Sequence, residues 1–272
     1  MKIGSKIFDI GSRTFIIGIL NVTPDSFFDG GNYSTVQQAI ERAMQLVADG
    51  ADIIELGGES SRPGHATVPI DVELERVLPV LAALSKKIDT PICIDTCKAA
   101  VADAALQNGA SMINDVWCFS RDKELAKVCA KHNAICCVMH NRDNTNYDNF
   151  LIDVVNDLKK GIDTLLQAGV SPGNIITDPG IGFAKSVEQN LEVMRNLSML
   201  TSLPHPVMLG TSRKSFMGKS IGLNIEERLE ATIATTVLGI SSQCDFIRVH
   251  DVLENKRAAM MADEIIRRRH LA

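Results

Sequence analysis

The sequence lacks the features that mark several classes of protein. Acidic residues outnumber basic ones, 33 Asp plus Glu against 28 Lys plus Arg, which gives a formal net charge of −5. Basic residues form a run only at Arg267, Arg268 and Arg269, which we interpret as the last turn of a helix, where cations complement the helix dipole. We therefore do not expect nucleic acid as a partner.

Long apolar segments are also missing. The N-terminal stretch MKIGSKIFDI has no apolar core of a signal peptide, and the uncharged stretch 231–244 is too short to span a bilayer. The cysteines form no CxxC pair, and Cys93, Cys136 and Cys137 fall within apolar runs typical of buried strands. We interpret them as reduced thiols rather than metal ligands, and expect a cytoplasmic protein that makes no membrane contact.

Short apolar runs alternate with longer amphipathic segments along the chain. This is the pattern of βα units around a parallel sheet. No linker, low-complexity segment or internal repeat interrupts it, so we predict a single domain over residues 1–272. Eight such apolar runs span residues 15–20, 52–56, 91–95, 112–116, 135–139, 174–178, 206–210 and 246–250.

Two properties of these units favour a closed barrel over an open sheet. The runs are almost continuously apolar, which predicts strands that are buried on both faces. The length of 272 residues is also close to the ~250 typical of a (β/α)8 barrel. We therefore predict an α/β protein with a single (β/α)8 TIM barrel, and we interpret residues 6–15 as an N-terminal β-hairpin that covers one end of it.

Nearly every predicted strand is followed by polar residues. In a βα barrel the C-terminal ends of the strands form the functional face, so these side chains should converge there. A single Asp or Asn at a strand end commonly caps the next helix, whereas a whole ring of polar residues favours a site. The ring comprises Asn21, Ser61, Arg62, Asp95, Asn114, Asp115, His140, Asp178, Ser212, Arg213, Lys214, Arg248 and His250.

The chemistry of this ring predicts a substrate with two different parts. Carboxylates such as Asp95 and Asp178 suit a flat heterocycle that carries several N–H donors. Cations such as Arg62, Lys214 and Arg248 suit a phosphate or pyrophosphate. We therefore expect the two sets to face each other across the barrel mouth.

Five sequence motifs contain most of these residues. They are NVTPDSFFDGG at 21–31, GGESSRPG at 57–64, DPGIGF at 178–183, SRK at 212–214 and RVHDV at 248–252. In this order, from the first predicted strand to the last, they resemble the dihydropteroate synthase family. The first, second and last motifs are highly specific for it.

The resemblance implies a reaction and the residues that serve it. The reaction is condensation of 6-hydroxymethyl-7,8-dihydropterin pyrophosphate with p-aminobenzoate, with Mg²⁺ as cofactor, in a homodimer. Asn21 is implied as the Mg²⁺ ligand, and Asp95, Lys214, Arg248 and His250 are implied as catalytic. The substrate-binding residues that it implies are Ser61, Arg62, Asp95, Asn114, Met139, Asp178, Phe183, Ser212, Lys214, Arg248, His250 and Phe27.

The resemblance also divides these residues among the parts of the substrates. The pyrophosphate is assigned Ser61, Arg248 and His250, and the pterin is assigned Asp95, Asn114, Asp178 and Lys214. Met139 and Phe183 would supply apolar walls, although ordinary barrel packing explains them too. Phe27 matches a position that walls the p-aminobenzoate pocket.

Two positions depart from the usual family pattern. Phe28 stands where a small Ser is commoner, beside the p-aminobenzoate and sulfonamide pocket, and Ala184 replaces a common Gly. Three alternatives stay open at this point: a methyltetrahydrofolate methyltransferase, a pterin-binding protein without turnover, and an unrelated phosphate-binding barrel. The NVTPDSF and SRK motifs argue against the methyltransferase, and a turnover assay separates the rest.

Overall fold

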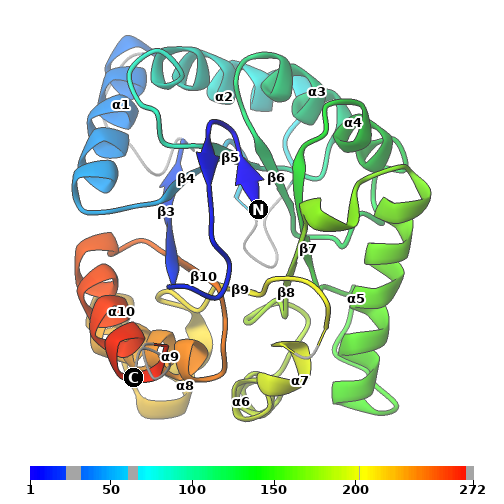
Figure 1. Ribbon diagram of the computed structural model, residues 1–272, viewed down its shortest axis with the longest axis vertical. Coiled ribbons are helices and arrows are strands. Elements are labelled where there is room, and N and C mark those ends of the chain that lie inside the picture. Colours follow the sequence, from blue (N-terminus) through cyan, green and yellow to red (C-terminus); the bar gives the residue numbers. More distant parts are fainter. Residues whose placement is uncertain (23–31, 61–66, 202, 268–272) are drawn as a thin grey trace.

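The computed structural model describes residues 1–22, 32–60, 67–201 and 203–267. Its main sheet is built from eight parallel strands, each followed by helical or turn segments (Figure 1). The strands are β3 (Phe15–Asn21), β4 (Ile53–Gly57), β5 (Ile92–Asp95), β6 (Met112–Asp115), β7 (Ile135–Met139), β8 (Ile175–Asp178), β9 (Met208–Leu209) and β10 (Phe246–Val249).

Helices form an outer layer around this sheet (Figure 1). They are α1 (Asn32–Ala48), α2 (Ile70–Leu84), α3 (Ala99–Gln107), α4 (Leu125–Lys131), α5 (Phe150–Gln167), α6 (Val187–Arg195), α7 (Ser198–Thr201), α8 (Ser215–Ile221), α9 (Leu229–Ser241) and α10 (Val252–Ile266). The short 3-10 helices η2 (Pro172–Asn174) and η3 (Ile225–Glu227) precede β8 and α9. Among the residues that the structure describes, no helix has the length and apolar character needed to cross a membrane.

The strand order closes the sheet on itself. The order is β8-β7-β6-β5-β4-β3-β10-β9, and every neighbouring pair is parallel. A single parallel bridge between Thr177 and Val207 then joins the two ends of the sheet. The predicted (β/α)8 barrel is therefore confirmed, with its seam between β8 and β9.

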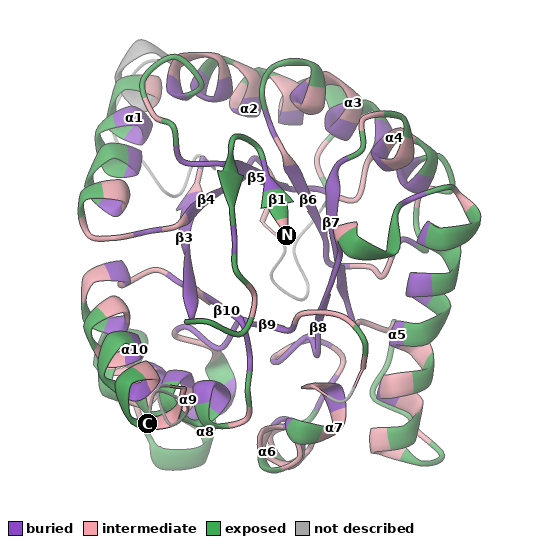
Figure 2. Ribbon diagram, viewed as in Figure 1, coloured by how far each residue is buried: buried purple, intermediate pink, exposed green. Residues whose placement is uncertain are grey.

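Side chains along each strand alternate between two buried regions. One set faces the helices and packs with them in the larger core, which includes Ile16, Ile54 and Ile94. The other set points into the barrel, where a separate cluster includes Phe15, Ile53 and further residues. Figure 2 shows the consequence, with buried strands inside and exposed positions along the outer faces of the helices. The inward cluster comprises Ile3, Phe8, Phe15, Ile17, Ile53, Cys93, Met112, Ile135, Cys137, Ile176, Met208 and Phe246.

The inward residues change from apolar to polar towards the C-terminal ends of the strands. On five strands, the residue two positions after an inward apolar residue is polar or charged. These residues are Glu55, Asp95, Asn114, Asp178 and Arg248, and the first four are buried. Because side chains alternate with a period of two, these residues share the barrel interior with the apolar cluster. The apolar layer therefore forms a floor beneath a polar layer at the barrel mouth.

A small antiparallel hairpin lies at the opposite end of the barrel. It pairs β1 (Lys2–Ile3) with β2 (Lys6–Ile7), and Gly4 in its turn has a positive φ of 58°. Phe8, just after β2, contacts Phe15 edge-on with ring centroids 4.9 Å apart. The predicted hairpin exists and covers this end, but its predicted bounds of 6–15 are wrong. The turn at Gly4 brings the pairing forward, and Phe8 packs into the barrel rather than continuing a strand.

Predicted strand bounds differ from the observed ones mainly at the seam. The seventh strand, expected over 206–210, is only Met208–Leu209. Pro206 has no N–H to offer a sheet, and Val207 pairs with β8 only through the isolated bridge. The eighth ends at Val249, so His250 follows the strand rather than ending it. In the other strands, the predicted and observed bounds differ by at most one residue at either end.

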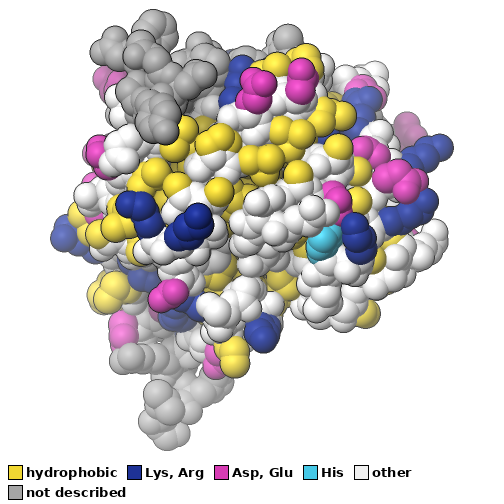
Figure 3. All heavy atoms as spheres, turned by 90° about the horizontal axis from the view of Figure 1, so that it is seen from above, with side chains coloured by type: hydrophobic (Ala, Val, Ile, Leu, Met, Phe, Trp, Pro, Cys, Tyr) yellow, Lys and Arg dark blue, Asp and Glu magenta, His cyan; other side chains and the backbone are white. Residues whose placement is uncertain are grey.

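The outer surface over α1 to α4 carries a band of hydrophobic side chains with charged residues mainly around it (Figure 3). The large exposed hydrophobic residues of these helices include Met44, 47% exposed, and Ile70, 45% exposed. Apolar groups of this kind are common on soluble proteins. The band assigns no partner by itself.

Candidate active site at the C-terminal end of the barrel

Four strands contribute to one hydrogen-bonded cluster in the polar layer. The Arg248 guanidinium binds Glu55 through Nε and Nη2, and Nη2 also lies 3.4 Å from Asp95 Oδ2. Asn114 Nδ2 donates to the other Glu55 oxygen at 3.2 Å. The cluster therefore links β4, β5, β6 and β10 across the barrel interior.

Burial and mutual contact set the charges in this cluster. Burial, and after it the nearby Glu55 carboxylate, raises the pKa of Asp95 to about 8, although Arg248 opposes the rise. Burial alone would lower the pKa of Arg248, but Glu55 and Asp95 outweigh burial and raise it. In the ligand-free protein at neutral pH, Arg248 is thus charged and Asp95 mostly protonated.

A second pair of charged groups, Asp178 and Lys214, lies on the other side of the mouth. Asp178 ends β8 and accepts a hydrogen bond from the Gly180 N–H at 2.7 Å. Burial raises its pKa, and Lys214 is the largest opposing influence. Burial likewise lowers the pKa of Lys214 to about 7, against the attraction of Asp178.

Gly210 separates these two groups of charged residues. A Cβ atom on Gly210 would lie 3.6 Å from Asp178 Oδ2 and 3.5 Å from Arg248 Cδ. Gly210 therefore faces both Asp178 and Arg248 and adds no side chain of its own between them. An acceptor carboxylate and a donor guanidinium consequently border the same space. The carboxylate suits the N–H donors of a flat heterocycle, and the guanidinium suits an acceptor or an anion.

Apolar groups wall this space next to the charged ones. Val116, Met139 and Phe183 form a small buried cluster, with Trp117 packed against it. The Lys214 ammonium lies 4.3 Å from the centroid of the Phe183 ring and donates to the Ile181 carbonyl. Met139 and Phe183 thus stand where an apolar wall was predicted, and they are not part of the main barrel cores.

Ser212 and His250 form a third contact at the mouth. Ser212 Oγ lies 2.9 Å from His250 Nδ1 and accepts from the His250 backbone N–H at 3.2 Å. Arg213 points away from this contact and pairs with Asp251 through two hydrogen bonds of 2.8 and 2.7 Å. Of the cations in the SRK motif, Lys214 is the one that reaches the space beside Asp178.

The predicted separation of cations from carboxylates is wrong in one respect. We expected Arg248 to face the carboxylates across the mouth, but it is ion-paired with Glu55, and its Nη2 lies 3.4 Å from Asp95 Oδ2. The reason is Glu55, a buried carboxylate that the sequence reasoning missed. The signal was present, because Glu55 is a charged residue at an inward position of the otherwise apolar strand IIELG.

Other predicted residues have different outcomes. Ser61, Arg62 and Phe27 lie outside the described residues. Asp115 faces away from the barrel interior and accepts from the backbone N–H groups of Trp117 and Phe119, at 2.9 and 2.6 Å, so it stabilises the loop after β6.

Asn21 is at the C-terminal end of β3, in register with Gly57 of β4. Its Oδ1 lies 3.5 Å from where a Gly57 Cβ would be, so the amide is at the barrel mouth beside the loop after β4. Within the described part of the chain, no group of three or more His, Cys, Asp or Glu could hold a metal. One amide oxygen suits Mg²⁺, because this ion often takes one or two protein ligands and completes its shell with phosphate and water.

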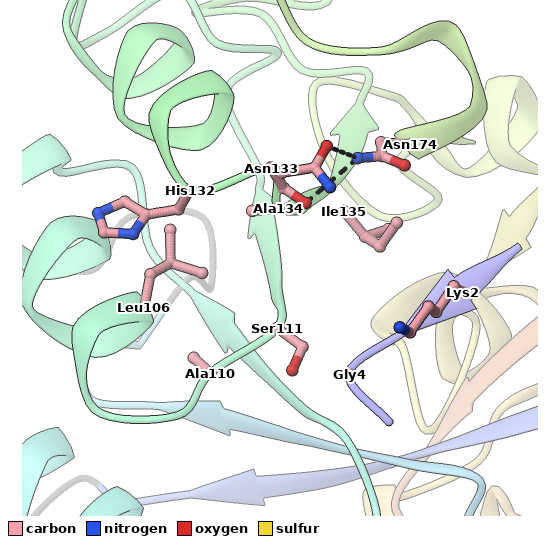
Figure 4. Close-up of a pocket in the computed structure, with 10 residues that line it drawn as sticks. All are labelled: Lys2, Gly4, Leu106, Ala110, Ser111, His132, Asn133, Ala134, Ile135 and Asn174. Atoms are coloured by element: carbon pink, nitrogen blue, oxygen red, sulfur yellow. Dashed lines mark hydrogen bonds between the residues drawn. The ribbon is translucent and has the colours of Figure 1, made fainter. Parts of the chain in front are cut away.

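A separate cavity of about 330 Å³ lies at the other end of the barrel (Figure 4). Its lining includes Lys2 of the hairpin, Ser111, His132 and Asn133, and Asn174 donates to Asn133 Oδ1 at 2.9 Å. Apart from Lys2, which is in β1, these residues precede strands of the barrel rather than follow them. The cavity contains none of the predicted site residues, as expected for the end of the barrel that serves stability.

Comparison with known proteins places this site in a family. The sequence model for "Pterin binding enzyme" matches residues 17–250. A dihydropteroate synthase of Clostridium beijerinckii is 55% identical over 98% of this chain and 100% of its own length. The chain belongs to the dihydropteroate synthase family of pterin-binding enzymes.

Solved structures of the dihydropteroate synthase family agree with the fold. The Clostridium difficile enzyme, crystallised in the presence of pteroic acid, has a TM-score of 0.94 and 51% identity, over 96% of this chain and 100% of that one. The Xanthomonas albilineans enzyme with 4-aminobenzoic acid has a TM-score of 0.90 and 35% identity, over 94% of both chains. The similarity thus covers the whole barrel.

Proposed function

We propose that this protein condenses 6-hydroxymethyl-7,8-dihydropterin pyrophosphate with p-aminobenzoate to give 7,8-dihydropteroate and pyrophosphate in folate biosynthesis. The observation that carries the proposal is the space between Asp178 and Arg248, which Lys214 also borders. It occurs in a chain 55% identical to a dihydropteroate synthase. Relatives of this chain were crystallised with pteroic acid and with 4-aminobenzoic acid.

Asp178 and Lys214 are the proposed recognition groups for the pterin. An ionised Asp178 accepts two parallel hydrogen bonds from the 2-amino group and the neighbouring ring N–H, and Lys214 donates to the acceptor edge. Asn114, which donates to Glu55 in the same polar layer, is the third residue proposed for the pterin. Met139 and Phe183 pack against the ring, since both are already part of the apolar wall.

Arg248, Ser212 and His250 are proposed to hold the pyrophosphate. In the reaction the bond between the exocyclic CH₂ and the pyrophosphate oxygen breaks with its electron pair on the pyrophosphate. A C–N bond to the aryl amine forms, and the proton that the amine loses passes to the pyrophosphate or to water. Because the amine is a weak nucleophile, stabilising the leaving group is the larger part of catalysis. Positive charge that develops on the pterin lowers the pKa of Asp95, so this carboxyl group releases its proton to water and the resulting carboxylate stabilises that charge.

Asn21 is the proposed protein ligand for Mg²⁺, on the grounds that its amide oxygen is at the mouth beside the loop after β4. When bound, the ion would neutralise charge on the pyrophosphate as it leaves. The remaining residues predicted for the pyrophosphate and p-aminobenzoate, Ser61, Arg62 and Phe27, keep their predicted roles.

Incubation of the protein with the dihydropterin pyrophosphate, p-aminobenzoate and Mg²⁺ tests the proposal. We expect 7,8-dihydropteroate and pyrophosphate in equal amounts, detected by chromatography and by a pyrophosphate-coupled assay. Methyl transfer from methyltetrahydrofolate, or pterin binding without turnover, would refute it.

We further propose a homodimer in the cytoplasm. Large hydrophobic side chains are exposed on the adjacent helices α9 and α10, among them Leu238 at 56%, Met261 at 60% and Ile265 at 56%. Such a cluster is typical of a subunit interface. Light scattering should give the dimer mass, and Met261→Glu should shift it to the monomer.

The proposed cytoplasmic location is supported by the cysteines. All seven cysteines are free thiols, as in a reducing compartment.

A further inference from the structure

The loop between β8 and α6 contains a buried cation that the proposed mechanism does not use. The Lys185 side chain is 9% exposed, and its ammonium makes three hydrogen bonds. The acceptors are His140 Nδ1 at 2.7 Å, the Gly180 carbonyl at 3.1 Å and the Phe183 carbonyl at 3.1 Å. All three N–H donors of the ammonium are therefore used within the loop and its neighbour β7.

His140 connects this cation to the rest of the barrel. Its side chain is fully buried after β7, and burial lowers its pKa to about 3. Burial lowers the pKa of Lys185 to about 7. In its charged form the Lys185 ammonium can only donate, so Nδ1 then accepts and the imidazole proton is on Nε2. Nε2 in turn lies 3.5 Å from Asp157 Oδ2 on α5. Through His140 the ammonium is thus fixed to the end of β7, outside its own loop.

The same loop supplies the groups that surround the pterin space. Its Gly180 N–H binds Asp178 at 2.7 Å, its Ile181 carbonyl accepts from Lys214 Nζ, and its Phe183 ring lies beneath the Lys214 ammonium. Gly180 and Gly182 have positive φ angles of 65° and 84°. The loop has no regular secondary structure to fix this conformation, and the Lys185 ammonium binds the two carbonyls at its centre.

We propose that Lys185 is a positioning residue for pterin recognition, whose ammonium holds the loop so that Asp178, Phe183 and Lys214 meet the pterin ring in the correct geometry. The inference rests on the proposed function, since it concerns the same site. It deepens that function by assigning a role to a residue that never touches substrate. A charge at this position also favours the ionised form of Asp178, because Lys185 is among the groups that lower the pKa of that carboxyl.

Replacement of the ammonium by an apolar group of similar length tests the inference. Lys185→Met should weaken binding of pteroic acid, measured by calorimetry on the folded protein, by roughly 10-fold or more. The KM for the dihydropterin pyrophosphate should rise with it, whereas binding of inorganic pyrophosphate with Mg²⁺ should stay within about 2-fold of the wild type. A matched control is Lys127→Met, which removes an ammonium that is 65% exposed on α4 and should change neither affinity.

A second pair of variants covers the case in which Lys185→Met does not fold. His140→Asn keeps an oxygen acceptor near the position of Nδ1, and His140→Leu removes it at similar volume. We expect weaker pteroic acid binding in His140→Leu and substantial recovery in His140→Asn. Wild-type pteroic acid affinity in folded Lys185→Met, or in His140→Leu, would overturn the inference, and so would equal losses for pteroic acid and pyrophosphate. Turnover by the wild type is measured in a separate assay. Failure of the proposed reaction can therefore be distinguished from failure of the inference about Lys185.

Discussion

Individual side chains at the barrel mouth have charges that depend on their neighbours. Asp95 and Asp178 are both buried aspartates at the C-terminal ends of strands, and their side chains point into the barrel. Burial raises the pKa of each. They differ in their partners, because Asp95 stands near the Glu55 carboxylate while Asp178 stands near the Lys214 ammonium. The two carboxyl groups are therefore suited to different tasks, one as a group that ionises during reaction and one as a charged acceptor.

Asp178→Asn should weaken the binding of pterin more than it weakens the binding of pyrophosphate. The amide loses the negative charge and one of the two acceptors that face the pterin N–H pair. A hydrogen bond to a buried charge contributes ~1.5 to 3 kcal/mol, so the affinity for pteroic acid should fall roughly 10- to 100-fold. Calorimetry with pteroic acid measures this change directly. Unchanged affinity would remove Asp178 from the pterin site.

The pH dependence of binding is a second test of Asp178. Because burial raises the pKa of Asp178, the affinity of the wild type for pteroic acid should fall as the pH is lowered through that pKa, and Asp178→Asn should lack this dependence.

Asp95→Asn should stabilise the fold while abolishing most of the activity. The folded pKa of Asp95 is about 8 against an ordinary value of 3.8. Between these values the unfolded chain is ionised and the folded one protonated, so this group costs stability as pH rises through that window. The neutral amide avoids the cost. At neutral pH the variant should gain roughly 1 kcal/mol or more in urea unfolding.

The pH dependence provides the control for that experiment. The gain in Asp95→Asn should be larger at about pH 7.5 than at about pH 5. Asp103→Asn offers a contrast, because a hydrogen bond from His132 lowers the pKa of that exposed carboxyl, and its removal should give no gain at either pH. An equal stability change for Asp95→Asn at both pH values would contradict the interpretation.

At the scale of an element, the loop from Asp178 to Lys185 depends on one close backbone approach. Gly180 has a positive φ, and a Cβ atom there would lie 1.9 Å from the His140 carbonyl oxygen. No L side chain fits without displacing either the loop or the end of β7. The glycine therefore allows the loop to reach both His140 and Asp178.

Gly180→Ala should destabilise the protein by roughly 2 kcal/mol or more and reduce pterin affinity at the same time. The matched control is Gly173→Ala in η2, where a Cβ would meet nothing within 4 Å. Urea unfolding compares their stabilities, and calorimetry with pteroic acid compares their affinities. If the two variants behave alike, the close approach at Gly180 does not determine the loop conformation.

At the scale of the whole molecule, the two ends of the barrel have different tasks. The hairpin end is filled by apolar groups such as Ile3, Phe8 and Phe246, whereas the opposite end holds Glu55, Asp95 and Arg248. This division is general for βα barrels, in which the N-terminal end serves stability and the C-terminal end serves chemistry. Changes at the two ends should therefore separate in their effects.

Phe8→Ala should lower stability without changing the site. Phe8 is 2% exposed and contacts Phe15 and Phe246. Removing a buried phenyl ring typically costs about 3 to 5 kcal/mol. We expect that loss in chemical denaturation, with kcat and KM near the wild-type values wherever the variant is folded. Full stability would show that the hairpin does not close the barrel core.

The apolar runs and their spacing were enough to predict the architecture, and the motifs at the strand ends were enough to predict which end of the barrel holds the polar residues. Strands such as Ile135–Met139 are short apolar runs, which indicates that they are buried. The eight repeats of such a run predicted the (β/α)8 barrel. Motifs at the strand ends then located Asp178, Lys214 and Arg248, because the chain direction of every strand brings its C-terminal residues to the same mouth. The hairpin was less well predicted, since a turn at Gly4 leaves only two residues in each strand.

Only the tertiary structure decided which of those polar residues touch and what charges they have. The ion pair between Glu55 and Arg248 joins residues 193 positions apart, and the contact between Lys185 and His140 joins residues 45 positions apart. Neither pair has a local pattern that could reveal it. Whether a carboxyl is ionised depends on its burial and on charges a few ångströms away, and both follow from how the chain closes in space.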